Sequence, residues 1–247
     1  MKKIGKVVAI IQARTGSTRL PSKVFADLAG APMLERVINR VGRARRLDEV
    51  VIATTDLPAD DGIEQFCNER KTLVHRGSPD DLLDRYYQTA RARAADVVVR
   101  ITSDCPLIEP EIIDKVVDEY EQGQPKVEYS SNTVVTRTYP RGLDAEAIRF
   151  DALERSWRED TNPAWREHAT PYIYRHPERF VMHIVTDPVD RSAMRWTVDT
   201  PEDLAFIRRI YDHFGNDRFS WRDVIALLDE HPDWSAMNAD VSQKVVP

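Results

Sequence analysis

A repeated alternation of short apolar segments with longer amphipathic segments is the feature that most constrains the fold of this chain. Four apolar runs are typical of buried strands, and segments with the helical spacing of apolar residues separate them; the runs are residues 7–11, 49–54, 72–75 and 97–101. This order predicts a parallel sheet with right-handed crossovers. We therefore expect an α/β fold with a doubly wound, mixed but mostly parallel sheet.

The first predicted helix covers residues 32–46, with Pro32 at its first position, where a missing N–H costs nothing. Further helices are predicted over residues 58–69, 79–90, 111–122, 150–158, 163–174, 201–213 and 220–230. A further strand is predicted over residues 127–132, and the alternation then breaks with irregular chain over 133–147. A later strand is predicted over residues 180–185, antiparallel to a neighbour.

The loop after the first strand has an unusual content. Arg14, Arg19 and Lys23 fall within ten residues, Gly16 permits a tight turn, and Thr15, Ser17 and Thr18 add hydroxyl groups. Such a loop at the carboxyl end of a strand suits a polyphosphate, because its backbone N–H groups can form an anion-binding nest. It lacks the glycines of a Walker A loop or a dinucleotide fingerprint. The alternative is a solvated basic surface.

This loop resembles the nucleotide-binding signature of the cytidylyltransferases through the pattern Gln12-Ala13-Arg14-x-Gly16-Ser17-x-Arg19-Leu20-Pro21-x-Lys23. These enzymes activate sialic acid, ketodeoxyoctonate and related acids as CMP derivatives, and the branch most similar to this chain is named after spore-coat polysaccharide biosynthesis. The resemblance covers most of the chain. It implies a Rossmann-like nucleotidyltransferase fold and a CTP site formed by Gln12, Ala13, Arg14, Gly16, Ser17, Arg19 and Lys23.

The segment after the third strand has a helix-start pattern. Ser78 is predicted as the N-cap, Pro79 as the first helical residue and Asp81 as the third. Capping alone explains these residues. The resemblance adds a cytosine and ribose pocket lined by this segment, with Arg76, Gly77 and Ser78 as nucleotide-binding residues.

Asp104 follows the fourth strand and is expected to face the basic loop. Mg²⁺ commonly binds one or two carboxylates together with phosphate oxygens and water, so Asp104 is predicted to be a metal ligand. The alternative is a turn or N-cap aspartate. Similar enzymes carry an aspartate before proline here. Cys105 is expected to be a packed small residue.

Asp199 is the second candidate metal ligand. A strand is predicted to end at Asp199, followed by a capping box in which Thr200 is the N-cap, Pro201 the first helical residue and Asp203 the third. Capping does not need Asp199, which is therefore free to face the strand-end cleft. Similar enzymes place a second Mg²⁺ ligand in this motif.

Residues 127–192 are expected to form an acceptor-binding and dimerisation lobe within a single domain covering residues 1–247. The resemblance rests here on Tyr139-Pro140-x-Gly142-Leu143-Asp144 and Arg166-Glu167-His168. Candidate acceptor-binding residues are Arg141, Glu146, Arg166 and His168; the alternative is a surface hairpin with ordinary salt bridges. We expect a homodimer formed through residues 127–185.

Composition limits the remaining possibilities. The net charge of −6 argues against general nucleic-acid binding, so the basic loop is a local feature. Cys67 and Cys105 show neither metal-ligand spacing nor a disulfide framework. The first apolar run is too short for a signal peptide, and no apolar segment approaches membrane-spanning length. We therefore expect a cytoplasmic protein without a membrane partner.

The predicted reaction is Mg²⁺-dependent transfer of CMP from CTP to an acidic acceptor, with release of pyrophosphate. Arg14, Arg19 and Lys23 would hold the triphosphate, with Lys23 and Arg14 catalytic and Asp104 and Asp199 holding the metal. The acceptor stays open between a nonulosonic acid, another sugar acid, a phosphonate and a small phosphorylated acid. A nucleotide-sugar glycosyltransferase is one alternative, although Thr102-Ser103-Asp104 lacks the usual Asp-x-Asp. A nucleotide-binding regulatory protein without turnover is the other.

Overall fold

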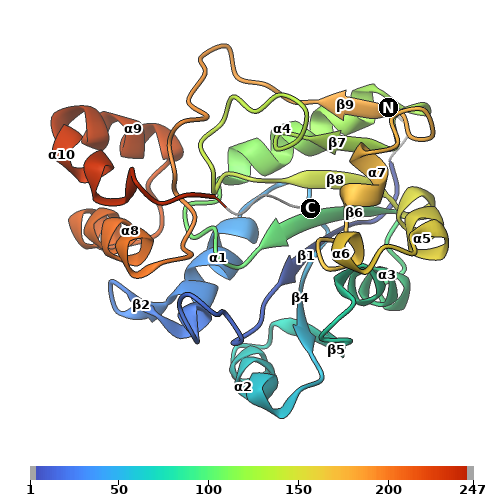
Figure 1. The fold of residues 1–247 in the computed structure, drawn as a ribbon, viewed down its shortest axis with the longest axis horizontal. Helices are drawn as coiled ribbons and strands as arrows, with labels where there is room; N and C mark the ends of the chain where they lie inside the picture. Colours follow the sequence, from blue (N-terminus) through green and yellow to red (C-terminus); the bar gives the residue numbers. More distant parts are fainter. Residues whose placement is uncertain (1–3, 244–247) are drawn as a thin grey trace.

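The computed structural model describes residues 4–243 and contains one mixed seven-stranded sheet, in the order β5-β4-β1-β6-β8-β7-β9 (Figure 1). The parallel part consists of β1 (Val7–Gln12), β4 (Glu49–Thr55), β5 (Leu73–Gly77) and β6 (Val97–Thr102). Next to β6 lie antiparallel β8 (Glu146–Arg149), then β7 (Tyr129–Ser131) and β9 (Met182–Ile184). The predicted α/β fold with a doubly wound, mostly parallel sheet is confirmed.

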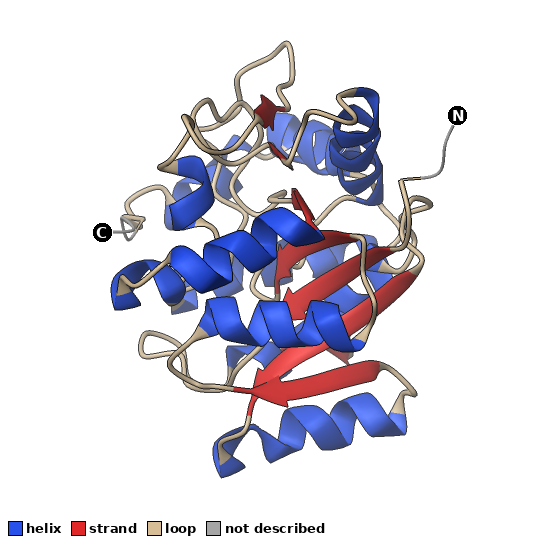
Figure 2. Ribbon diagram, turned by 90° about the vertical axis from the view of Figure 1, so that its right-hand side faces the viewer, coloured by secondary structure: helices blue, strands red, loops and turns tan. Residues whose placement is uncertain are grey.

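Helices and a small hairpin complete the chain, and Figure 2 shows several of the helices beside the twisted sheet. The hairpin pairs β2 (Asp27–Leu28) with β3 (Ala31–Pro32). The helices are η1 (Lys23–Phe25), α1 (Met33–Val41), η2 (Pro58–Asp60), α2 (Asp61–Glu69), α3 (Leu82–Ala92), α4 (Pro110–Gln122), α5 (Phe150–Glu159), α6 (Pro163–Arg166), α7 (Pro171–Tyr174), α8 (Pro201–Phe214), α9 (Trp221–Glu230), α10 (Pro232–Ser235) and η3 (Ala236–Asn238).

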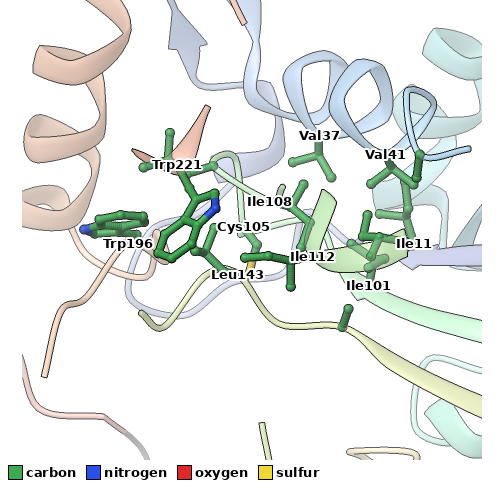
Figure 3. Close-up of a cluster of buried hydrophobic side chains, with 14 of the residues drawn as sticks. Ile11, Val37, Val41, Ile101, Cys105, Ile108, Ile112, Leu143, Trp196 and Trp221 are labelled. Carbon is green, nitrogen blue, oxygen red and sulfur yellow. The ribbon is translucent and has the colours of Figure 1, made fainter. Parts of the chain in front are cut away.

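Side chains of β1 alternate between two hydrophobic cores. Ala9 and Ile11 enter a core that includes residues of α1, α4, α8 and α9, whereas Val8 and Ile10 enter a core built with α3, α5 and α7. Successive side chains of a strand point to opposite faces, so a strand with a core on each face is apolar throughout. Figure 3 shows part of the first core, where Val37 of α1 lies on the side of the helix that faces the sheet.

Two predicted helix starts are wrong. Pro32 belongs to the short strand β3, where it pairs with Asp27, and α1 begins one residue later and ends at Val41 before Gly42. Ser78 is not an N-cap. Asp81 caps α3 instead, because its side chain accepts a hydrogen bond from Asp84 N, while the Ser78 hydroxyl accepts from the backbone of residues 80 and 81.

The later half of the chain departs further from prediction. β8 begins at Glu146, in the stretch that was expected to be irregular, and β9 pairs parallel with β7, not antiparallel. The predicted helix over residues 163–174 is divided into α6 and α7, because Ala169 has a φ of +67° and Pro171 starts a new helix. Residues 196–199 form no strand; Arg195 alone makes a bridge with Arg141.

The predicted capping box before α8 is confirmed. The Thr200 hydroxyl accepts from Asp203 N, and the Asp203 carboxylate accepts from the backbone N–H of Thr200. Replacing Thr200 by alanine removes one of these bonds, so we expect the free energy of unfolding to fall by about 1 kcal/mol. Urea denaturation would measure this. The control is Thr161→Ala at an exposed loop position, and equal stability of the two variants would contradict the capping role.

Across residues 4–243, no helix has both the length and the apolar character needed to cross a membrane.

Candidate active site

A polar pocket lies where β1 and β6 end, beside the loop that follows β1. Its volume is about 380 Å³. The residues that line it are Gln12, Ala13, Arg14, Gly16, Ser17, Thr18, Arg19, Lys23, Pro79, Leu82, Arg85, Thr102, Ser103, Asp104, Glu167, His168 and Asp199. The carboxyl ends of strands in open α/β sheets are the usual place for ligands, so the pocket is the candidate active site.

The loop is held at its base by a buried carboxylate that the sequence analysis missed. Asp60 accepts hydrogen bonds from Thr15 N and from the Thr15 hydroxyl, both at 2.7 Å. Thr15 O in turn accepts from Ser17 N and Ser22 N, which closes the turn. A Cβ added at Gly16 would meet no atom within 4 Å, so this glycine leaves open space beside the loop.

Lys23 is the centre of the polar network. Its ammonium group donates to Asp104 Oδ2 at 3.0 Å, Asp199 Oδ1 at 2.9 Å and Val198 O at 2.7 Å, and its side chain is 10% exposed. Burial disfavours the charged form, but the two carboxylates outweigh burial and raise the pKa of Lys23 above its ordinary value. Lys23 is therefore fully charged at neutral pH.

Backbone hydrogen bonds bring Asp104 and Asp199 together. Val198 N donates to Asp104 O at 2.8 Å, and the Thr197 hydroxyl donates to the same oxygen at 3.2 Å. Burial acts to raise the pKa of Asp104, yet Lys23 and the Thr102 hydroxyl hold that pKa below its usual value, so the carboxylate is ionised. Asp199 is therefore positioned by the loop 197–199 and not by the strand that was predicted to end there.

Arginines hold Asp199 from the other side. Arg19 lies 3.1 Å from Asp199 Oδ2, and Arg195 donates to the same oxygen at 3.0 Å. Arg195 also binds both oxygens of Asp203 in the capping box. The cap of α8 and the Asp199 carboxylate therefore share one guanidinium, which fixes the position of Asp199 next to the basic loop.

The donor set fits one divalent cation that is shared with a phosphate ligand. Within residues 4–243, no group of three His, Cys, Asp or Glu side chains could hold a metal. Asp104 and Asp199 supply two carboxylates close enough to contact one ammonium group, and Mg²⁺ commonly takes one or two carboxylates with phosphate oxygens and water.

Several predicted site residues lie elsewhere. Arg76 pairs with Asp61 and Glu64 and does not line the pocket, and neither do Gly77, Ser78, Arg141, Glu146 and Arg166. Glu146 is a buried residue of the sheet, at the start of β8, and binds Arg100 and the Tyr129 hydroxyl. Arg166 binds Asp81 and the carbonyl groups of residues 157 and 160.

His168 is the one candidate acceptor residue that lines the pocket. Burial lowers the pKa of His168, so its imidazole is neutral at pH 7.

Arg141 lies next to Arg195, because the backbones of these two residues form an isolated parallel β-bridge. Burial and the nearby Arg137 lower the pKa of Arg141. Gly142 makes this approach possible, because at its φ of +103° a Cβ would lie 2.6 Å from the Trp196 carbonyl carbon.

Cys105 has no catalytic character. Burial and the neighbouring Asp104 raise the pKa of its thiol well above the usual value. Figure 3 shows Cys105 among the side chains of Ile108, Ile112 and Leu143, as expected for a packed small residue.

The sequence analysis also missed Arg85, which is buried and lines the pocket. The sequence carries one weak indication of this residue. Arg85 lies between Leu82 and Tyr86 on α3, so a cation interrupts the apolar face of that helix.

Known proteins resemble this chain over most of its length. A family model described as cytidylyltransferase matches residues 8–223. The chain is 32% identical over 236 residues to the spore coat polysaccharide biosynthesis protein SpsF of Bacillus subtilis, covering 92% of this chain and 95% of that protein. A 3-deoxy-manno-octulosonate cytidylyltransferase of Trichlorobacter lovleyi is 36% identical over 115 residues, which is 47% of this chain and 45% of that protein.

Among solved structures, a cytidylyltransferase from Leptospira borgpetersenii superposes with a TM-score of 0.90 and 32% identity, covering 98% of this chain and 100% of that chain.

Proposed function

This chain belongs to the cytidylyltransferase family, and we propose that it moves CMP from CTP onto an acidic sugar acceptor in a Mg²⁺-dependent reaction that releases pyrophosphate. The observation that carries this proposal is the position of Lys23. Its ammonium group lies between Asp104 and Asp199 and next to a loop with two further cations. Because the chain belongs to this family, neither a glycosyltransferase nor a regulatory protein without turnover is needed to explain the site.

The basic loop would hold the triphosphate. Arg14 is half-exposed at the pocket, and its contact with Glu167 at 3.8 Å is loose enough to be exchanged for a phosphate. Arg19 and Lys23 face the same space from the other end of the loop. Positioning and charge neutralisation would then supply most of the catalysis, as is usual when a phosphorus centre is attacked.

Asp104 and Asp199 would hold Mg²⁺, which supplies Lewis-acid stabilisation of the phosphate oxygens when bound. The ammonium of Lys23 is then free to exchange a carboxylate for a phosphate oxygen near the attacked phosphorus. In that position the ammonium group would stabilise the negative charge that develops during attack. Arg195 continues to orient Asp199 throughout, because it also remains bound to Asp203.

The acceptor would meet His168 inside the pocket and Arg141 beyond the pocket lining. We favour a sugar acid as the acceptor, because a 3-deoxy-manno-octulosonate cytidylyltransferase matches about half of this chain. A neutral imidazole is a suitable hydrogen-bond partner for a hydroxyl group of such an acid. Burial, Arg137 and Arg195 lower the pKa of Arg141 while Asp144 raises it, so an acceptor carboxylate would add to the stabilisation that Asp144 gives. Arg166 and Glu146 do not line the pocket, so they would act on the acceptor only indirectly, through their contacts with Asp81 and Arg100.

CTP is expected to stabilise the protein more than UTP, ATP or GTP. A ligand at one hundred times its Kd adds about 2.7 kcal/mol to the free energy of unfolding. Thermal-shift titration of each nucleotide with Mg²⁺ would show the order. Equal shifts for all four nucleotides would contradict cytidylyl transfer.

We propose that residues 127–192 are the acceptor and dimerisation lobe and that the protein is a homodimer. Val135, Val181 and Val189 are exposed large hydrophobic residues of this lobe, from 50% to 76% exposed. Light scattering at micromolar concentration should give twice the chain mass, and Val181→Asp should shift the protein toward a monomer. Leu57→Asp, at a similarly exposed position outside the lobe, is the control. A monomeric wild type would remove the proposed interface.

A further inference from the structure

The chain after α9 packs against α8 and lies beyond residue 223, where the match to the family model ends. Figure 1 shows α8, α9 and α10 grouped at one side of the molecule. Trp234 anchors this C-terminal segment, residues 232–243. Its side chain is buried in the first core, and the Arg209 guanidinium of α8 lies 4.9 Å from the centre of its ring. The segment is therefore held in one place relative to α8.

Asn238 connects the C-terminal segment to the polar network around Asp199. It is 4% exposed, and its Nδ2 donates to Arg195 O at 3.0 Å and to Asp203 Oδ1 at 2.9 Å. Both partners are acceptors, so the two N–H groups of a side-chain amide suit this position and a carboxylate does not. Asn238 thus holds the backbone of Arg195 and the partner of its side chain at the same time.

Arg195 divides its donors between the C-terminal segment and the site. Its Nη1 donates to Gln243 Oε1, its Nε and Nη2 bind Asp203, and its Nη2 also donates to Asp199 Oδ2 at 3.0 Å. A guanidinium is planar, with N–H groups in fixed directions. Any contact that fixes one edge of the Arg195 guanidinium therefore determines where its other edge meets Asp199.

We propose that the C-terminal segment positions the Asp199 carboxylate for the metal ion, with Asn238 as the positioning residue. This inference rests on the proposed function, in which Asp199 holds Mg²⁺. Arg19 and Lys23 also contact Asp199, but both line the pocket and would turn to phosphate oxygens when CTP is bound. Of these three cations, Arg195 would then be the one still on Asp199, so its placement by Asn238 would decide how the carboxylate faces the metal.

The test compares the Kd of Mg²⁺–CTP with that of CTP in EDTA, without an acceptor, by isothermal titration calorimetry. The ratio of these two Kd values gives what the metal adds to binding. Asn238→Ala should weaken Mg²⁺–CTP binding about 10-fold, the usual effect of losing a group that orients a metal ligand, and leave CTP binding in EDTA unchanged. Asn238→Asp keeps the size but places an acceptor against two acceptors, so its loss should be at least as large.

Kinetics give a second readout. In Asn238→Ala the Mg²⁺ concentration for half-maximal rate should rise about 10-fold, with most of kcat recovered at saturating Mg²⁺. Asn68→Ala, at an exposed position, is the matched control. Val224→Ala on α9 is the control for stability, because it removes buried apolar atoms without removing a polar group and should leave the Kd of Mg²⁺–CTP as in wild type.

Unchanged Mg²⁺–CTP binding in both Asn238 variants would overturn the inference, and so would an equal loss in Val224→Ala. If the Asn238 variants do not fold, Gln243→Ala decides, because it removes one contact of Arg195 and keeps Asn238. It should show a smaller loss of the same kind, and no loss would contradict the role of the segment. A wild type that binds Mg²⁺–CTP no better than CTP in EDTA would instead contradict the proposed function.

Discussion

Replacing Lys23 by alanine is expected to lower kcat on the order of 100- to 1,000-fold, the usual loss when one donor to a developing oxyanion is removed. Lys23 is the only side chain that contacts both Asp104 and Asp199 within the described residues. Its loss removes the charge that faces the attacked phosphorus. It also leaves two carboxylates adjacent to the phosphates, so CTP should bind more weakly when metal is absent.

Steady-state kinetics with saturating Mg²⁺ would measure the effect. Lys126→Ala, at an exposed position, is the matched control, and Lys23→Arg keeps the charge with a different shape. Because the two carboxylates raise the pKa of Lys23, its contribution should be constant across neutral pH and be lost only as pH rises through that raised value. A Lys23→Ala enzyme with kcat within threefold of wild type would contradict the role of this residue.

Asp104→Asn and Asp199→Asn are each expected to lower turnover by at least about 100-fold while the fold stays intact, since a bound cation stabilises phosphate charge by several kcal/mol. Nucleotide binding in EDTA should persist or tighten, because one source of repulsion for the triphosphate is gone. Asp199 also contacts Arg19, so any gain in CTP affinity should be smaller in the Asp199 variant than in the Asp104 variant.

Activity measured against Mg²⁺ concentration separates these cases. Asp56→Asn is the control, because Asp56 is an exposed aspartate that follows β4 outside the pocket. Near-normal turnover of either variant at limiting Mg²⁺ would mean that the aspartate has only a structural role.

The first half of the sheet was predictable because its signals are local. β1, β4 and β6 are mostly apolar runs, and β5 begins with the apolar pair Leu73-Val74. The strands bring the loop 12–23 and Asp104 to one edge. The capping box at Thr200 was predictable for the same reason. It depends on residues three positions apart.

The second half was less predictable because long-range contacts decide it. Glu146 lies in a strand although it is charged, since Arg100 on the neighbouring strand β6 neutralises it. Asp199 reaches Lys23 through backbone bonds to Asp104 and not through a strand of its own. Arg85 looked like an ordinary helix residue, and only its burial beside the pocket distinguishes it.

Cytidylyl transfer to a sugar acid can be tested in one assay, which measures release of pyrophosphate from CTP, UTP, ATP and GTP, each with Mg²⁺ and a panel of sugar acids. We expect release from CTP alone, dependent on both the acid and Mg²⁺, with formation of one CMP-linked product. Release from all four nucleotides, or from none with any acid, would contradict a cytidylyltransferase acting on a sugar acid.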